Sequence, residues 1–443
     1  MNRQEWRAAL AVGLLYLIRM MGLFMVIPVL PIAEDQFNLS TPFLIGIAIG
    51  VHGFTQALLQ IPFGLMSDRF GRKKLITVGL LLFISGSFIA AFSQNVYGLI
   101  AGRALQGCGA IASTLLALMS DLTRVEQRTK SMTVIGVAIA ISFGIALLVG
   151  PALSHIYGVR ILFLFSGVSG LLGLLILYTI IPTPKLMTQN LDLKFQMARV
   201  REALSDFSFL RLNMSTLILH YLLISGFCVF PLLFDVTGEI DRAEHSFYYL
   251  ILLIASLFVI APFIYFSDRW HQTKPIFLIM VGSCVCSSLL LTEVRSFYLV
   301  LLGIGLFFAC FNLLETMLPS EVGKISPAGA RGTYMGFFMT SQFFGFFLGG
   351  VMGGWMLVSR DISFLFAINT VVAFCWFLIL MTMAQADNIE SRTIQLAEIR
   401  NGSAKEVLKE LLSTRGVLDA VVIEQENVAY LKVDRSKFTD GSI

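Results

Sequence analysis

Two side chains that can exchange protons lie inside long apolar stretches of the sequence. His220 can change its charge near neutral pH, and Glu315, with Asn312 one turn earlier, is the only carboxylate well inside an apolar stretch between residues 211 and 384. Because a carboxylate in hydrocarbon is costly, it predicts a function, here proton binding and release, with Asn312 facing a substrate. Two alternatives remain open: His220 as a hydrogen-bonded core residue, and Glu315 as a residue at the membrane interface, because Pro319 follows closely.

A polar stripe and an arginine add to this set. His52, Gln56 and Gln60 recur every four residues and therefore share one face of a helix. Arg19 lies about 20 Å along its helix from Trp6, at 1.5 Å per residue. We expect all four side chains to face a cavity for a small-molecule substrate, with Arg19 also taking part in proton coupling. The alternatives are hydrogen-bonded packing between spans and, for Arg19, bonding to backbone carbonyls or snorkelling to one surface.

The elements that hold these residues are membrane-spanning helices. Hydrophobic residues make up 56% of the 443, charged residues 14%, and the mean hydropathy is +0.81, whereas a soluble domain carries roughly 25% charge. A lipid bilayer is therefore the expected surrounding. Stretches long enough to cross about 30 Å of hydrocarbon form two sets of six. Their expected limits are 6–33, 43–66, 75–93, 96–119, 129–154 and 161–181, then 211–235, 244–267, 275–293, 296–318, 331–357 and 363–384.

The loops between these stretches differ in charge. Lys and Arg concentrate on the side that holds both termini and the polar linker 182–210, which predicts that this side is cytoplasmic. The opposite loops carry only Arg160, Arg242, Arg295 and Arg360. Because the net charge of +4 arises largely from such loops, it does not indicate a nucleic-acid partner.

An internal repeat relates the two sets of spans at an offset of 200 residues. The residues that recur are Pro62, Phe63, Ser67, Asp68, Arg69, Lys74 and Ile76, at positions 262, 263, 267, 268, 269, 274 and 276. Acidic Asp121 likewise matches acidic Glu321. The repeat predicts two homologous halves, 1–181 and 211–384, related by a pseudo-twofold axis along the membrane normal with a central cavity between them.

The sequence lacks the residues that metal binding, ATP-driven transport and enzymatic catalysis require. All six cysteines lie in apolar stretches without a CxxC pair or a histidine pair, so no metal site is expected. The sequence has no GxxxxGK[ST] loop, which argues against an ATP-driven pump. No nucleophile–base cluster indicates an enzyme, and we expect no cofactor.

Residues 385–443 have the composition of a soluble domain. TIQLAEI (393–399) predicts a strand, 403–416 a helix with Ser403 at its N-cap and Gly416 at its end, and 417–425 and 427–434 two further strands. This β-α-β-β order is typical of the opening of a ferredoxin-like unit, so either the domain is abbreviated or the chain is cut short. Without cysteine, histidine or methionine it is not expected to bind soft metals. Self-association, a regulatory ligand or a passive role remain open.

Two motifs carry a resemblance to a known family. GLMSDRFGRKK (64–74) matches the loop signature G-x-x-x-D-R-x-G-R-K-K of the major facilitator superfamily at every fixed position. LIAGRALQGCGA (99–110) resembles the fourth-span motif L-x-x-x-R-x-x-Q-G-x-G-A of its drug:proton antiporter family. The fifth-span motif G-x-x-x-G-P-x-x-G-G departs from the pattern and is kept only as Gly150-Pro151. This departure weakens the assignment to antiport.

The resemblance implies roles for individual residues. The loop signature would form a cytoplasmic latch of Gly64, Asp68, Arg69, Gly71, Arg72, Lys73 and Lys74, with Asp121 as a further anion. Asp68 ends the second span, where the helix dipole disfavours a carboxylate, so it requires positive partners such as the loop arginines and the start of the eleventh span near Gly332. Opening toward the cytoplasm would break this latch. The alternative is that the basic residues only keep the loop on the cytoplasmic side.

The resemblance also implies a fold and an activity. The fold is an all-α membrane protein of twelve transmembrane helices in two pseudo-symmetric halves, followed by the small α+β domain. The activity is proton-coupled export of a drug or another small hydrophobic molecule in a bacterial inner membrane, by rocking of the halves. Arg103, from the fourth-span motif, would take part in proton coupling or be structural. The alternatives are another solute, coupling or direction, and a membrane ligand receptor that signals through the C-terminal domain.

Overall fold

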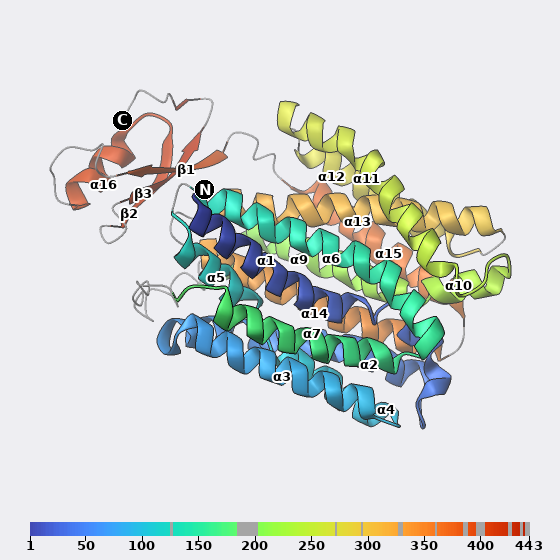
Figure 1. The fold of residues 1–443 in the computed structure, drawn as a ribbon. Coiled ribbons are helices and arrows are strands. Elements are labelled where there is room, and N and C mark those ends of the chain that lie inside the picture. Colours follow the sequence, from blue (N-terminus) through green and yellow to red (C-terminus); the bar gives the residue numbers. More distant parts are fainter. Residues whose placement is uncertain are drawn as a thin grey trace.

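The computed structural model describes residues 1–124, 127–183, 203–270, 273–293, 296–326, 331–358, 361–383, 389–395, 404–423, 428–434 and 437–438. Within these residues, twelve spans are long and apolar enough to cross a membrane, as the sequence predicts. They run roughly side by side along one bundle (Figure 1). The N-terminus and the C-terminal sheet lie at the same end of this bundle.

The first six spans contain seven α-helices, because one span is broken. They are α1 (Arg3–Phe24), α2 (Pro42–Phe70), α3 (Arg72–Phe92), α4 (Val96–Cys108), α5 (Ala112–Leu122), α6 (Arg128–Tyr157) and α7 (Arg160–Thr179). Polar side chains cap several of their first turns: the Thr41 hydroxyl accepts from Leu44 N at 3.2 Å, and Asn95 Oδ1 accepts from Gly98 N at 2.8 Å. Gly71 separates α2 from α3 with a φ of 99°, which a residue with a side chain rarely adopts.

The second six spans also contain seven helices within the described residues. They are α9 (Phe207–Phe227), α10 (Phe230–Thr237), α11 (His245–Trp270), α12 (Thr273–Leu290), α13 (Phe297–Ile325), α14 (Arg331–Leu357) and α15 (Ile362–Met381). Asp206, Ser296 and Asp361 cap the first turns of α9, α13 and α15. The prolines inside the long helices are tolerated because neighbouring helices shield the freed backbone groups.

The first and seventh spans end differently from the sequence prediction. The helix α1 ends at Phe24, nine positions before the expected limit at residue 33. Pro28 and Pro31 follow, and the chain continues through turns into the short 3₁₀ helices η1 (Leu30–Ile32) and η2 (Glu34–Gln36). The equivalent seventh span breaks between α9 and α10, where Pro231 lies in the first turn of α10.

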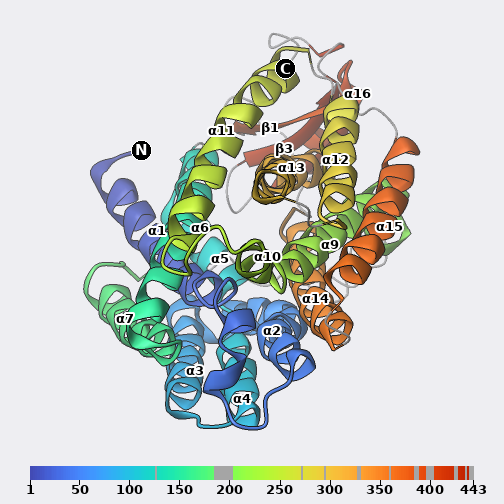
Figure 2. The same ribbon diagram turned by 90° about the vertical axis from the view of Figure 1, so that its right-hand side faces the viewer.

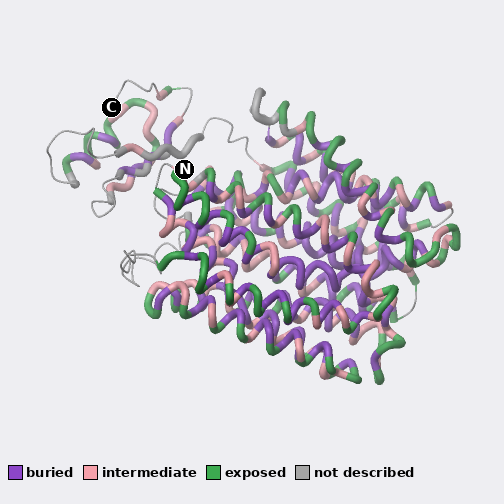
Figure 3. Tube along the Cα trace, in the orientation of Figure 1, coloured by how far each residue is buried: buried purple, intermediate pink, exposed green. Residues whose placement is uncertain are grey.

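The two groups of six spans meet along two helix pairs. In Figure 2, α1–α7 gather on one side and α9–α15 on the other, with α2 beside α14 and α6 beside α11. Buried residues concentrate between the helices and exposed ones on the outside of the bundle (Figure 3). Glycines allow α2 and α14 to touch: a Cβ at Gly50 would lie 2.7 Å from Phe347 O, and one at Gly354 would lie 2.8 Å from Gly46 Cα.

The α2–α14 contact lies toward one end of the bundle. We call this end of the bundle, where α2 begins and α14 ends, the Thr41 end. The opposite end, which holds the N-terminus and the α2–α3 loop, is called the Gly71 end. At the Gly71 end, a Cβ at Gly332 or Gly336 of α14 would meet no described atom within 4 Å. The halves therefore touch tightly near the Thr41 end, whereas the face of α14 that carries Gly332 and Gly336 has no described atom close to it at the Gly71 end.

A small sheet with one helix follows the spans. The strands β1 (Ile389–Gln395), β2 (Val417–Ile423) and β3 (Val428–Asp434) form an antiparallel sheet in the order β1-β3-β2. The helix α16 (Ala404–Ser413) buries Val407 and Leu411 against it. β1 begins four residues before the expected 393–399, because its pairing runs from Ile389 opposite Asp434 to Gln395 opposite Val428. The expected N-cap Ser403 lies outside the described residues.

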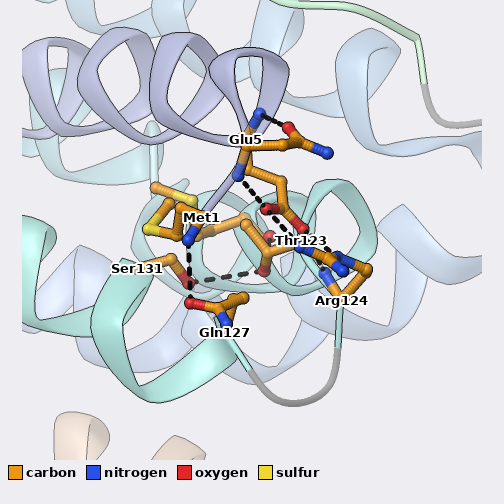
Figure 4. A network of polar contacts seen from close by, with 8 residues as sticks. Met1, Glu5, Thr123, Arg124, Gln127 and Ser131 are labelled. Carbon is orange, nitrogen blue, oxygen red and sulfur yellow. Dashed lines mark hydrogen bonds and ion pairs between the residues drawn. The ribbon is translucent and has the colours of Figure 1, made fainter.

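A polar network fixes the N-terminus to the loop between α5 and α6. Asn2 and Glu5 form a capping box, with Glu5 N 2.8 Å from Asn2 Oδ1 and Asn2 N 2.7 Å from Glu5 Oε2. The Arg124 Nε donates to Glu5 Oε1 at 2.9 Å, and the Met1 ammonium donates to Gln127 Oε1 at 3.1 Å. Figure 4 shows this network, whose labelled residues are Met1, Glu5, Thr123, Arg124, Gln127 and Ser131. It anchors α1 at the Gly71 end.

Candidate transport site and loop cluster

The structure brings His220 and Glu315 together, although the sequence predicts them only separately. His220 on α9 and Glu315 on α13 approach to 3.3 Å between Nε2 and Oε2. Gln342 on α14 joins them: its Nε2 lies 2.9 Å from His220 Nε2 and donates to Glu315 Oε1 at 3.1 Å. His220 also stacks on Phe346, with ring centroids 5.3 Å apart. Three helices of the second half thus meet at one titratable unit, which we call the His220–Glu315–Gln342 triad.

The hydrogen bonds of His220 indicate the tautomer of its ring. Nδ1 lies 2.8 Å from the Thr216 carbonyl and therefore carries a hydrogen that it donates there. Nε2 then accepts from Gln342 when the ring is neutral and faces Glu315 with an N–H when it is charged. Without a proton between them, Nε2 and the carboxylate would be two hydrogen-bond acceptors that face each other. One proton shared between them stabilises the pair. The side chain of His220 is 1% exposed and that of Glu315 31%, so the carboxylate is the more accessible member of the pair.

Asn312 contacts a serine rather than the triad. Its Nδ2 donates to Ser256 Oγ on α11 at 2.7 Å, and that hydroxyl donates to the Leu253 carbonyl at 2.6 Å. This links α13 to α11 within the second half. A role for Asn312 in a substrate cavity stays a prediction.

Arg19 lies buried among α1, α2 and the break in the fourth span. Nη2 and Nε donate to the Gly109 carbonyl at 2.7 and 3.2 Å, and Nη2 also donates to Gln56 Oε1 at 2.9 Å. Only 2% of the residue is exposed. The bonds to the Gly109 carbonyl agree with the alternative in which Arg19 is a structural residue bonded to backbone carbonyls. Nη1 makes no hydrogen bond in the described part of the chain.

Arg103 lies on α4 in the same half and is also buried. It donates to the Ala48 carbonyl on α2 at 3.2 Å and to Gln106 Oε1 at 2.9 Å, and Gln106 in turn donates to Ser87 Oγ on α3 at 2.8 Å. This network holds α2, α3 and α4 together. Like Arg19, Arg103 has no carboxylate within ion-pair distance among the described residues, and its Nη2 is unpartnered there.

The polar stripe of α2 lies at the boundary between the halves. His52, Gln56 and Gln60 are all buried on one face, as their spacing predicts. Gln60 Nε2 lies 3.6 Å from Met339 Sδ on α14, so the stripe reaches the other half. Among the described residues, His52 Nδ1 and Nε2, Gln56 Nε2 and Gln60 Oε1 form no well-aligned hydrogen bond. Buried polar atoms of this kind require water, a ligand or another conformation.

The loop signature centres on Arg72. Its guanidinium forms ion pairs with Asp68, one turn earlier across Gly71, and with Asp121 Oδ2 on α5 at 3.0 Å. It also donates to Ser67 Oγ at 2.6 Å. Asp68 and Asp121, which the resemblance assigns to a latch, thus contact the same guanidinium, and the latch itself stays a prediction. For the other expected partner of Asp68, the start of α14, a Cβ at Gly332 would meet no described atom within 4 Å, and residues 327–330 lie outside the described part of the chain.

The remaining signature residues have separate surroundings. Lys73 donates to the Ile181 carbonyl and lies 5.9 Å from the Tyr178 ring centroid. Arg69 lies over the Phe70 ring, and Lys74 is exposed. A Cβ at Gly64 would meet Ser113 Oγ at 3.5 Å, an ordinary contact.

The shortened fifth-span motif is a site of close packing. A Cβ at Gly150 on α6 would lie 2.6 Å from the Met25 carbonyl at the end of α1. Pro151 follows inside the same helix. The glycine therefore permits direct backbone contact between α6 and the end of α1.

Twelve apolar spans in two repeated groups, with ionisable side chains inside them, define a multi-pass membrane transport protein. The family model of the Major Facilitator Superfamily matches residues 12–317 and 215–423, and the chain belongs to this family. The expected resemblance is therefore confirmed, and with it the conclusion that the chain is a transporter rather than an enzyme.

Individual relatives agree with this assignment. The chain is 38% identical to the Inner membrane transport protein YajR of Escherichia coli (strain K12), over 99% of this chain and 96% of that protein. It is 27% identical to Multidrug resistance protein 1 of Bacillus subtilis (strain 168), over 80% of this chain and 90% of that protein. The crystal structure of a D-xylose-proton symporter superposes with a TM-score of 0.69 at 17% identity, covering 86% of this chain and 98% of that one, which shows a shared fold.

Proposed function

We propose that the protein is a proton-coupled secondary transporter that exports a small, largely apolar molecule by alternating access. The observation that carries the coupling is the His220–Glu315–Gln342 triad. It places a partly exposed carboxylate 3.3 Å from a buried histidine, and one proton stabilises the pair. Because the triad joins α9, α13 and α14, a change in its protonation alters the contacts among three helices.

The distribution of contacts between the halves supports alternating access. α2 and α14 touch through Gly50 and Gly354 near the Thr41 end, whereas a Cβ at Gly332 or Gly336 of α14, toward the Gly71 end, would meet no described atom within 4 Å. The excess of Lys and Arg at the Gly71 end supports a cytoplasmic location for it and for both termini. We therefore infer that the structure represents the state that is open toward the cytoplasm. In the opposite state, the loop cluster around Arg72 would meet the start of α14 and act as the latch.

The proposed direction of transport and the proposed substrate class rest on similarity to relatives. Two relatives are named multidrug resistance proteins, one of them Multidrug resistance protein 1 of Bacillus subtilis (strain 168). The motif match over residues 99–110 supports the same assignment to a drug:proton antiporter, and Arg103 of that motif is the further residue we assign to coupling. The phenylalanines around the triad, such as Phe311 and Phe346, suit an apolar substrate.

The test uses membrane vesicles with an imposed pH gradient. A panel of fluorescent apolar compounds with acidic, neutral and basic end groups is followed in vesicles containing the wild type or Glu315→Gln. We expect at least one compound to move in response to the gradient in the wild type. Glu315→Gln should lose this response but retain exchange of the same compound between the two sides without a gradient. An unchanged response in Glu315→Gln would remove the triad from the mechanism, and absence of exchange in the wild type would favour a receptor.

We further infer that the C-terminal domain is ferredoxin-like. The order β1-β3-β2, with β3 antiparallel to both neighbours, places a strand between β1 and β2 as in the split β-α-β arrangement. β1 lies against α13, the helix that carries Glu315, so the domain is placed to influence the triad. We propose a regulatory role through a ligand or self-association.

A further inference from the structure

Two buried positive charges in the first half lack a negative partner among the described residues. Arg19 is 2% exposed and Arg103 is fully buried, and no described carboxylate is in ion-pair contact with either. The carbonyl and amide oxygens that they contact supply partial charge only. A buried charge without a counter-ion is energetically costly, so a retained one indicates that a counter-ion is bound at some stage of the cycle.

The fourth span is broken beside Arg19. α4 ends at Cys108 and α5 begins at Ala112, and the Gly109 carbonyl at the break accepts two hydrogen bonds from Arg19. The first N–H groups of α5 have no helical carbonyl to bond, as at any helix start. In membrane transporters, the positive end of such a half-helix is suited to an anionic group. The guanidinium thus bonds to the carbonyl end of α4 and lies beside the break at which the amide end of α5 begins.

Unpartnered donors gather at this break. Arg19 Nη1 is buried and forms no hydrogen bond among the described residues, and neither does the hydroxyl of Thr114 in the first turn of α5. Arg19 and Gln56 are in direct contact at 2.9 Å. Buried donors without acceptors imply that an acceptor is missing from this state.

We propose that the substrate carries a carboxylate, which binds to Arg19, Gln56 and the start of α5. This inference rests on the proposed transport function and specifies its substrate class as an apolar acid. Gln60, one turn along α2, contacts Met339 of the other half, so the boundary next to this site opens when the halves rock apart. The apolar part of the substrate then faces the phenylalanines of the second half, and the acid faces the first.

The test measures binding to the purified full chain in lipid nanodiscs. The probes are naphthalene, indole and long alkyl carboxylic acids, each matched with its primary amide and its amine. We expect the acids to bind at least about tenfold more tightly than their matched amides and amines, a difference of about 1.4 kcal/mol. Arg19→Gln should reduce this acid-over-amide ratio to about one, whereas Arg160→Gln, which removes an exposed arginine, should leave it unchanged.

A second variant covers the case in which Arg19→Gln does not fold. Gln56→Glu places a carboxylate beside Arg19 Nη2 and keeps the arginine paired, so it should fold and also lose the acid preference. Equal binding of acids and amides to the wild type, no acid binding at all, or an acid preference that survives in both variants would overturn the inference. Gradient-driven transport of only neutral or basic compounds would overturn it while leaving the proposed function intact. Acid-selective binding without any response to a pH gradient would support the carboxylate site and overturn the proposed proton-coupled transport.

Discussion

At the scale of single residues, the sequence identifies ionisable groups inside the membrane but not their partners. His220 and Glu315 are visible as charges in apolar stretches, and the repeat shows that Glu315 replaces Leu115 of the first half. That the two residues meet depends on how α9 and α13 face each other, which hydropathy does not specify. Gln342 is absent from the residues predicted from the sequence, although it is the only amide side chain in α14 and a polar residue in such a span is a usable signal.

Gln342 should stabilise the triad. Gln342→Leu removes the donor to His220 Nε2 and Glu315 Oε1, and a buried polar group left unsatisfied costs about 1–3 kcal/mol. We expect a corresponding loss of unfolding free energy, measured by denaturation in detergent. The matched control is Thr340→Val, whose hydroxyl donates to the Gly336 carbonyl of its own helix at 3.0 Å and should have a smaller effect. Equal effects of the two changes would show that Gln342 has no special role.

Asp68 should be required for transport but not for folding. Its side chain is about one-third exposed in the ion pair with Arg72, so Asp68→Asn should change stability by less than about 1 kcal/mol. Without the carboxylate, the latch with the start of α14 cannot form in the opposite state, and transport should be lost. Membrane insertion and topology, tested by labelling of the loops, should stay normal. Full transport by Asp68→Asn would leave the loop with a topological role only.

At the scale of helices, the sequence predicts the number and order of spans well, and their ends and breaks less well. Twelve spans follow from apolar length alone, and the described residues contain all twelve. The early end of α1 could have been predicted from Pro28 and Pro31. The break between Cys108 and Ala112 has no proline, and its Gly109 carbonyl accepts hydrogen bonds from Arg19. Such a tertiary contact is invisible in a single sequence.

The close contact between α2 and α14 should be needed for one of the two states. Gly50→Leu places a side chain where a Cβ would already lie 2.7 Å from the Phe347 carbonyl. The halves should then be unable to close at the Thr41 end, and exchange of substrate should fall at least about tenfold, because tight packing tolerates no added atoms. Gly282→Leu on α12, which packs within the second half and where an added Cβ would lie 3.8 Å from Phe377, is the control and should transport normally. Normal exchange in both variants would mean that this contact does not form during transport.

At the scale of the whole molecule, the two repeats share one architecture and differ in chemistry. The first half has Arg103 where the second has Gly303, and Arg72 where the second has Gln272. The second half has the acid Glu315 instead. We therefore assign the latch and the positive charges for a substrate to the first half, and the proton site to the second. Comparing the repeats predicts this division, but only the structure places each group beside its partners.

The central claim is that protonation of the triad shifts the balance between two states of the molecule. It is tested most directly by spin labels at Phe70→Cys and Gly332→Cys, which lie at the Gly71 ends of α2 and α14, in a variant without other cysteines in nanodiscs. We expect two distance populations whose ratio changes with pH. In Glu315→Gln the ratio should no longer depend on pH. A single distance population that does not change with pH in the otherwise unaltered protein would contradict this claim.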